Sequence, residues 1–151
     1  MKLDTYINRI KNLSSNLEEL IYKELKEKEN FVLAIPKRRL YQKGTDAFDV
    51  KITPPYKPST IRYKKNKGQV KSHVTLRDTG KLYSTFKIVK EGKNIDFTVP
   101  NNSKTIFLTN HYEGNELFGF SPNDGEKVFE LFIKPFLEEI INPNEDIDIE
   151  I

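Results

Sequence analysis

The chain has 151 residues, of which 36% are hydrophobic and 31% charged, and its net charge is +3. This length predicts one domain with a hydrophobic core, and the lack of cysteine excludes disulfides, thiolate chemistry and cysteine-based zinc sites. No apolar run approaches the roughly 18 residues that span a bilayer, and the N-terminal sequence lacks the apolar stretch of a signal peptide. We therefore expect no membrane contact, and the lack of cysteine fits a reducing cytoplasm.

Residues 3–28 are predicted to form one amphipathic helix, because apolar residues recur there at spacings of three and four. The serines at 14–15 are expected to weaken its middle, since serine competes for backbone hydrogen bonds. The sequence FVLAI (31–35) fits either a short buried strand or the end of this helix. Pro36 then fits the first position of a second helix, which Gly44 would end as a C-terminal cap.

Residues 44–74 are predicted to form a long, irregular basic loop. Its three prolines forbid a regular helix, and PSTIRYKK is expected to hold a single helical turn capped by Ser59. Loops of this length are usually functional or disordered. Six of its seven cations are therefore the candidate interaction residues: Lys57, Arg62, Lys64, Lys65, Lys67 and Lys71.

The second half of the chain predicts a hairpin followed by helix. Residues 84–99 contain two alternating runs joined by EGKN, which is typical of an antiparallel hairpin. KTIFLTNHYEG (104–114) fits either a short helix or a third strand. Ser121 can cap a final helix that begins at Pro122, and Pro135 should kink that helix.

Together these elements predict one α+β domain: a long N-terminal helix, a central antiparallel hairpin or sheet with a long basic loop, and a C-terminal helix packed on the sheet. Residues 142–151 are predicted to be an acidic tail or an added edge strand. The predicted core comprises the apolar stripe of the first helix with Leu76, Leu82, Phe86, Ile88, Ile95, Phe97, Phe129, Phe132 and Phe136.

Charge is unevenly distributed along the chain. Residues 37–77 contain twelve Lys/Arg and two acids, whereas residues 138–151 contain six acids and no base. Such asymmetry indicates charged partners, although two solvated surfaces of an ordinary domain would give the same pattern.

The tripeptide Asp78-Thr79-Gly80 matches the active-site turn of aspartic proteases. A protease needs two such aspartates that share a proton in an apolar site, so this chain would have to dimerise. Arg77 and Lys81 flank the motif, and cations lower the pKa of a neighbouring carboxylate. The favoured interpretation is a turn in which Asp78 or Thr79 caps a short helix.

The basic stretches PKRR (36–39) and RYKKNKG (62–68) could hold phosphate. Tyr41, Tyr56 and Tyr63 interleave with them, as in single-strand binders that stack bases on aromatic rings. This pattern supports a nucleic-acid-binding protein as the alternative function, and a solvated basic loop is the plain explanation. No glycine-rich phosphate motif is present.

No catalytic constellation stands out in the sequence. His73 and His111 lack nearby partners with metal-ligand spacing, and Ser84 and Thr85 have no evident base. We therefore predict neither a catalytic site, a metal site nor a cofactor.

The order of the motifs carries more information than any one of them. LYQKGTDAFDVKITPPYKPSTIRYKKNKG is followed by VTLRDTGKLYSTFKI, a hairpin, FLTNHYEG and FGFSPNDGEKVFELFI. This arrangement resembles the virion morphogenesis (tail completion, G-like) family of tailed bacteriophages over roughly residues 30–140. The matching residues are Pro58, Ser59, Thr60, Leu76, Thr79, Gly80, Leu82, Phe86, His111, Gly114, Phe118, Gly119, Phe120, Ser121 and Asp124.

The resemblance implies a non-enzymatic structural protein of the virion, assembled in the host bacterial cytoplasm. Such proteins act at the neck, usually as rings between the portal-bound connector and the tail. The partners implied are further copies of the chain, portal or connector proteins and tail proteins, with DNA contact through the basic loop as a further option. The chain departs from the family pattern at LTNHYEG, which matches only loosely.

Overall fold

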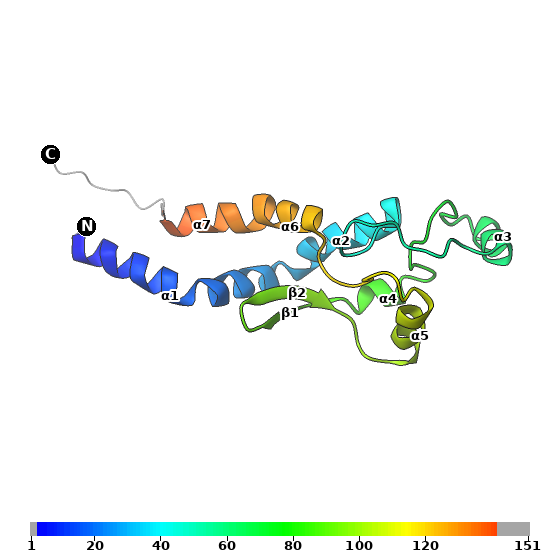
Figure 1. Cartoon of the computed structure of the whole chain (residues 1–151). Coiled ribbons are helices and arrows are strands. Elements are labelled where there is room, and N and C mark those ends of the chain that lie inside the picture. Colours follow the sequence, from blue (N-terminus) through cyan, green and yellow to red (C-terminus); the bar gives the residue numbers. More distant parts are fainter. Residues whose placement is uncertain (1–2, 142–151) are drawn as a thin grey trace.

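The computed structural model describes residues 3–141, and at residues 3–6, 9–10 and 13–14 it describes the backbone alone. The molecule is elongated, and its only sheet within these residues is a two-stranded hairpin (Figure 1). The predicted α+β class is confirmed, whereas the predicted acidic tail lies outside the described residues. The elements in chain order are α1 (Leu3–Glu27), α2 (Glu29–Lys43), α3 (Pro58–Asn66), α4 (Lys81–Ser84), β1 (Lys87–Glu91), β2 (Asn94–Thr98), α5 (Ser103–His111), α6 (Pro122–Val128), the π-helical turn η1 (Phe129–Ile133) and α7 (Lys134–Ile141).

The N-terminal helix α1 matches its prediction, including a weak point in its middle. Asn16 has non-helical angles (φ −121°, ψ 15°). One residue earlier, the Ser15 hydroxyl donates to the carbonyl of Asn12 at 3.1 Å. Short polar side chains thus compete with the helical hydrogen bonds, which accounts for the kink.

The prediction that Pro36 begins a helix is wrong, because α2 runs through it from Glu29 to Lys43. FVLAI is therefore helical, and the break between the first two helices falls at Lys28. Proline inside a helix removes a hydrogen bond, but here Pro36 is buried beside a row of core residues, and the packing offsets that loss. Gly44 ends α2 as predicted, with φ of 63° and its N–H directed at the carbonyls of Arg39 and Leu40.

The loop predicted over residues 44–74 contains more helix than expected. α3 extends over nine residues rather than one turn, and Ser59 is not its cap. The N-cap is Lys57, which contributes no side-chain hydrogen bond, and Pro58 occupies the first helical turn. The remainder is irregular apart from a single antiparallel bridge between Thr45 and Lys51.

The predicted hairpin is confirmed, with Ile88 of β1 directly opposite Phe97 of β2. Its outer edge is held at the junction of α1 and α2. The Ile88 N–H donates to the Glu29 carboxylate (3.1 Å), and the Lys26 ammonium donates to the Ile88 carbonyl (3.0 Å). The ambiguous segment after the hairpin forms the helix α5, which begins with a capping box between Asn102 and Thr105.

The last helix begins as predicted, with Ser121 as its cap and Pro122 in its first turn. Ser121 and Asp124 form a reciprocal capping box. A kink was predicted at Pro135, and the structure has a π-helical turn just before this residue. In this turn the Lys134 N–H is bonded to the Phe129 carbonyl, and such turns accommodate irregularities within helices.

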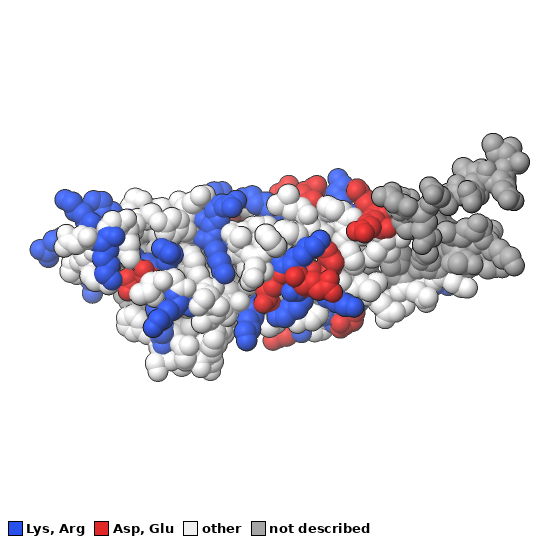
Figure 2. Space-filling model, turned by 180° about the vertical axis from the view of Figure 1, so that it is seen from behind, with Lys and Arg blue, Asp and Glu red and all other residues white. Residues whose placement is uncertain are grey.

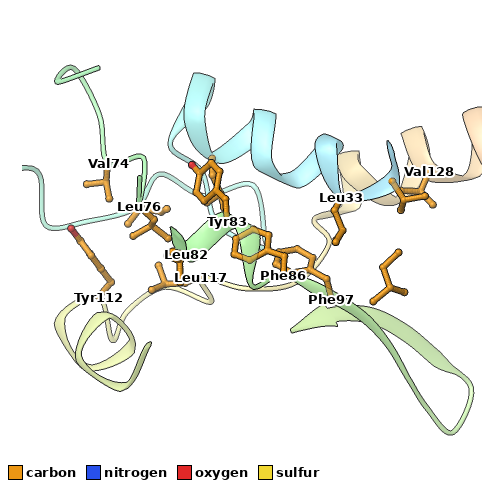
Figure 3. Close-up of a cluster of buried hydrophobic side chains, with 14 of the residues drawn as sticks. Leu33, Val74, Leu76, Leu82, Tyr83, Phe86, Phe97, Tyr112, Leu117 and Val128 are labelled. Carbon is orange, nitrogen blue, oxygen red and sulfur yellow. The ribbon is translucent and has the colours of Figure 1, made fainter. Parts of the chain in front are cut away.

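The helices α1 and α2 lie between the hairpin and the C-terminal helices (Figure 1). The core lies where these elements meet and contains Phe86. Its ring stacks on that of Phe97, with ring centroids 4.7 Å apart (Figure 3). Five predicted core residues are buried, namely Leu76, Leu82, Phe86, Ile88 and Phe97. Ile95 and Phe132 are partly buried, whereas Phe129 is 44% exposed.

Candidate interaction surface

The basic residues of the predicted loop gather at one end of the molecule, around α3 (Figures 1 and 2). Residues 57–81 contain eight basic side chains and one acid, Asp78. The structure separates these cations into two groups, those bound within the fold and those free to contact a partner.

Lys64 belongs to the first group, which corrects its prediction as an interaction residue. Only 5% of it is exposed. Its ammonium donates to the carbonyl of Arg77 at 2.9 Å and to the side chain of Gln69 at 3.4 Å. Lys64 therefore ties α3 to the chain before α4. Sequence reasoning missed this role because nothing in a run of lysines distinguishes the one that faces inward.

Lys67 is also engaged, in an exposed cluster with Tyr63, Gln69 and Asp78. Its ammonium bonds the Tyr63 hydroxyl and lies 3.5 Å from the Asp78 carboxylate. The Gln69 amide donates to the Asp78 carbonyl at 2.9 Å. Slight desolvation opposes ionisation of Asp78, but hydrogen bonds from Gln69 and the charge of Lys67 lower its pKa. An exposed, cation-paired carboxylate of this kind does not suit the proton-sharing dyad of an aspartic protease.

The Asp-Thr-Gly motif forms a turn, although neither Asp78 nor Thr79 is the helix cap predicted for it. The N-cap of α4 is Gly80 itself, with φ of 88°. This left-handed conformation favours glycine. The Thr79 hydroxyl accepts the Lys81 N–H at 3.4 Å, and Leu82 follows as a buried core residue.

Each of the three tyrosines considered for base stacking carries a cation from its own chain over its ring. Arg77 lies over Tyr41 at 5.6 Å, Lys64 over Tyr56 at 5.0 Å and Lys67 over Tyr63 at 4.4 Å. One face of each ring is thus occupied by an internal cation–π contact. This arrangement favours a structural role for the tyrosines over a stacking platform.

The second group consists of the exposed cations of residues 57–81 that have neither an ion pair nor a cation–π contact within residues 3–141. Its members are four of the six predicted interaction residues and one further lysine: Lys57, Arg62, Lys65, Lys71 and Lys81. These charges define the free basic surface of the α3 end.

Arg39, from the basic stretch 36–39, is also unavailable to a ligand. It is buried against Asp124, the third residue of α6, and donates to the Gly119 carbonyl at 3.3 Å. Burial raises the pKa of Asp124, and the Arg39 charge opposes that rise. This pair could not be found from the sequence, because its two members are 85 positions apart.

The remaining motif residues lie around the end of α5. His111 is exposed and stacks on Phe107 with ring centroids 5.7 Å apart. Gly114 is exposed in the following turn and has open space at its Cα. The predicted motif residues Asp78, Thr79, Gly80 and Leu82 thus lie in and after the turn into α4, whereas His111 and Gly114 lie at the end of α5.

Comparison with known proteins gave no match to a family model, to a curated protein or to a solved structure. Within residues 3–141, no helix is long and apolar enough to cross a bilayer. The same part of the chain contains no group of three side chains placed to hold a metal ion.

Proposed function

We propose that this chain is a non-enzymatic structural subunit of a tailed-bacteriophage virion, located at the neck between head and tail. It associates head to tail with further copies of itself, forming a ring that docks to connector and tail proteins. The observation that carries this proposal is the surface of free cations at the α3 end of an elongated molecule whose C-terminal sequence is acidic.

The α3 end carries the free basic surface defined above. α7 ends at the opposite end of the molecule (Figure 1), with Glu138 and Glu139 exposed. Beyond α7 the sequence adds four acids and no base. In a head-to-tail ring each subunit buries one surface against a different surface of its neighbour, and opposite charges orient such contacts.

The order of the motifs over residues 30–140, which resembles that of the virion morphogenesis family, is the reason for proposing a virion protein. Several of them hold the fold together, which suits a protein whose task is to present surfaces. Gly80 makes the turn into α4, and Ser121 with Asp124 begins α6.

The oligomeric state of the purified chain tests the assembly part of the proposal. We expect native mass spectrometry to detect a closed oligomer that dissociates when Arg62→Glu and Lys65→Glu are combined. The matched control is Lys87→Glu with Lys93→Glu, which changes the net charge equally at exposed positions of the hairpin. A chain that stays monomeric at all concentrations, or equal effects of both double variants, would contradict the charge-guided ring.

Immunogold electron microscopy of virions tests the location. We expect label at the junction of head and tail. Particles that lack the chain would exclude a role as a virion component.

A nucleic-acid-binding function is the second candidate, and the free cations of the α3 end are the observation in its favour. The internal cation–π contacts of Tyr41, Tyr56 and Tyr63 weigh against base stacking. Titration with duplex DNA at two salt concentrations separates the candidates. Tight binding with a steep salt dependence would favour nucleic acid, whereas weak binding lost at physiological salt is what any basic surface gives.

A further inference from the structure

The loop between α2 and the prolines at 54–55 is held rigidly around one buried carboxylate. Asp46 is only 2% exposed. Its carboxylate accepts the N–H groups of Phe48 and Val50, both at 2.9 Å, and the amide of Asn115 at 2.8 Å. The antiparallel bridge between Thr45 and Lys51 closes the loop.

This loop is also fastened to the segment after α5. The Ala47 N–H donates to the Glu116 carbonyl at 2.8 Å, and Asn115 donates to the Lys51 carbonyl at 3.2 Å. On its other side, the Asp49 carboxylate accepts the Asn123 N–H at 3.2 Å. The backbone of residues 45–51 is therefore fixed at several points.

The rigid loop presents two large apolar side chains to solvent. Phe48 is 68% exposed and Val50 is 55% exposed. Neither contributes to the core, so the fold does not account for their apolar character. Apolar side chains on a pre-organised loop are suited to binding, because little conformational freedom remains to be lost on association.

A second exposed apolar patch lies on α5. Phe107 is 64% and Ile106 49% exposed. The Phe107 ring is steadied by its stacking on His111. Beside this patch is a hollow of about 310 Å³, lined by Val99, Pro100, Asn101, Thr105, Ile106, Thr109 and Asn110. Its volume is near the lower limit of about 300 Å³ for ligand pockets, which suits one or two inserted side chains.

We propose that Phe48 and Val50 of one copy bind the α5 patch of a second copy, Phe48 entering the hollow beside Ile106 and Phe107. The flanking charges are complementary. Lys51 follows Val50 and Glu113 follows α5; both are exposed and neither has an ion-pair partner among the described residues. This contact rests on the self-association proposed above, and Phe48 is its apolar anchor.

The contact joins two unlike surfaces of the chain, and in the proposed head-to-tail ring it repeats from copy to copy. A symmetric pairing of two Phe48 loops would leave the α5 patch exposed in both copies.

Site-specific cross-linking tests this contact, because the native chain contains no cysteine. Lys51→Cys is mixed with a differently tagged Glu113→Cys chain, which leaves all four apolar side chains in place, and a short bismaleimide is added. We expect a covalent heterodimer. The matched control replaces Lys51→Cys by Lys93→Cys, an exposed lysine of the hairpin turn, and should give none.

The outcomes distinguish this contact from the proposed function. Oligomers without the specific cross-link would overturn the contact alone, whereas a chain that never associates would overturn both. Phe48→Ser should in addition weaken self-association at least tenfold, as expected of an interface anchor. It should leave the melting temperature of the monomer unchanged, and unchanged association would overturn the anchor.

Discussion

Arg39 of α2 and Asp124 of α6 form an ion pair inside the protein, with their side chains only 4% and 3% exposed. The same carboxylate accepts the Ser121 N–H at 3.1 Å and so completes the capping box of α6. One buried charge thus fixes both the start of α6 and its position against α2. Removing either partner would leave the other charge buried without compensation.

We predict that Arg39→Ala and Asp124→Ala each lower the free energy of unfolding by about 3–5 kcal/mol. The double variant should lose much less than the sum of the two, because no charge is left unpaired. Urea denaturation of the four proteins measures this coupling. The exposed pair Lys134–Glu130 serves as control, and breaking it should cost no more than about 1 kcal/mol. Additive losses at Arg39 and Asp124 would contradict the interpretation.

Lys64 and Lys65 are adjacent lysines with opposite expected effects on stability. Lys64→Ala removes the hydrogen bonds of a buried lysine to Arg77 and Gln69 and should lower the free energy of unfolding by about 1–3 kcal/mol. Lys65→Ala changes an exposed side chain and should stay within about 0.5 kcal/mol of the native value. Chemical denaturation compares the two, and equal effects would mean that Lys64 is not structural.

Phe86 and Phe129 provide a matched test of the core. Phe86 is 3% exposed and contacts three aromatic rings. Phe86→Ala should therefore lower the free energy of unfolding by about 3–5 kcal/mol. Phe129→Ala should have a clearly smaller effect, since that ring is 44% exposed. A larger loss at Phe129, measured by thermal or urea unfolding, would mean that the core is centred elsewhere.

Asp46 should make stability depend on acid pH. Burial opposes its ionisation, but hydrogen bonds from Asn115 and from the N–H groups of Val50 and Phe48 lower its pKa. A lowered pKa means that the folded state favours the ionised carboxylate. Its contribution is therefore complete above the unfolded value of about 3.9 and is lost as pH falls through the folded pKa.

Melting temperatures recorded between about pH 2 and pH 6 test this expectation. Asp46→Asn should reduce stability at neutral pH and flatten the acid decline. Glu91→Gln, a change at an exposed carboxylate of the hairpin, controls for the loss of one charge. An acid decline that persists unchanged in Asp46→Asn would assign it to other groups.

The sequence by itself determined those features that depend on neighbours along the chain. The α1 helix, the hairpin at 84–99, the Gly44 cap and the Ser121–Pro122 helix start were all predicted, because period, turn residues and caps act over a few positions. Where local rules misled, packing had overridden them. Pro36 lies inside a helix because it is buried with its neighbours, and α3 extends beyond one turn although Ser59 does not cap it.

Only the tertiary structure decided which charged side chains face inward. Lys64 and Lys65 are adjacent and chemically identical, yet the first is buried and the second exposed. Arg39 finds Asp124 across 85 positions, and Asp46 organises a loop through Asn115. Burying a charge is favourable only where partners are already in place, and those partners come from distant parts of the chain. The candidate surface therefore follows from the basic composition of residues 57–81, whereas the residues free to act on it follow from the fold.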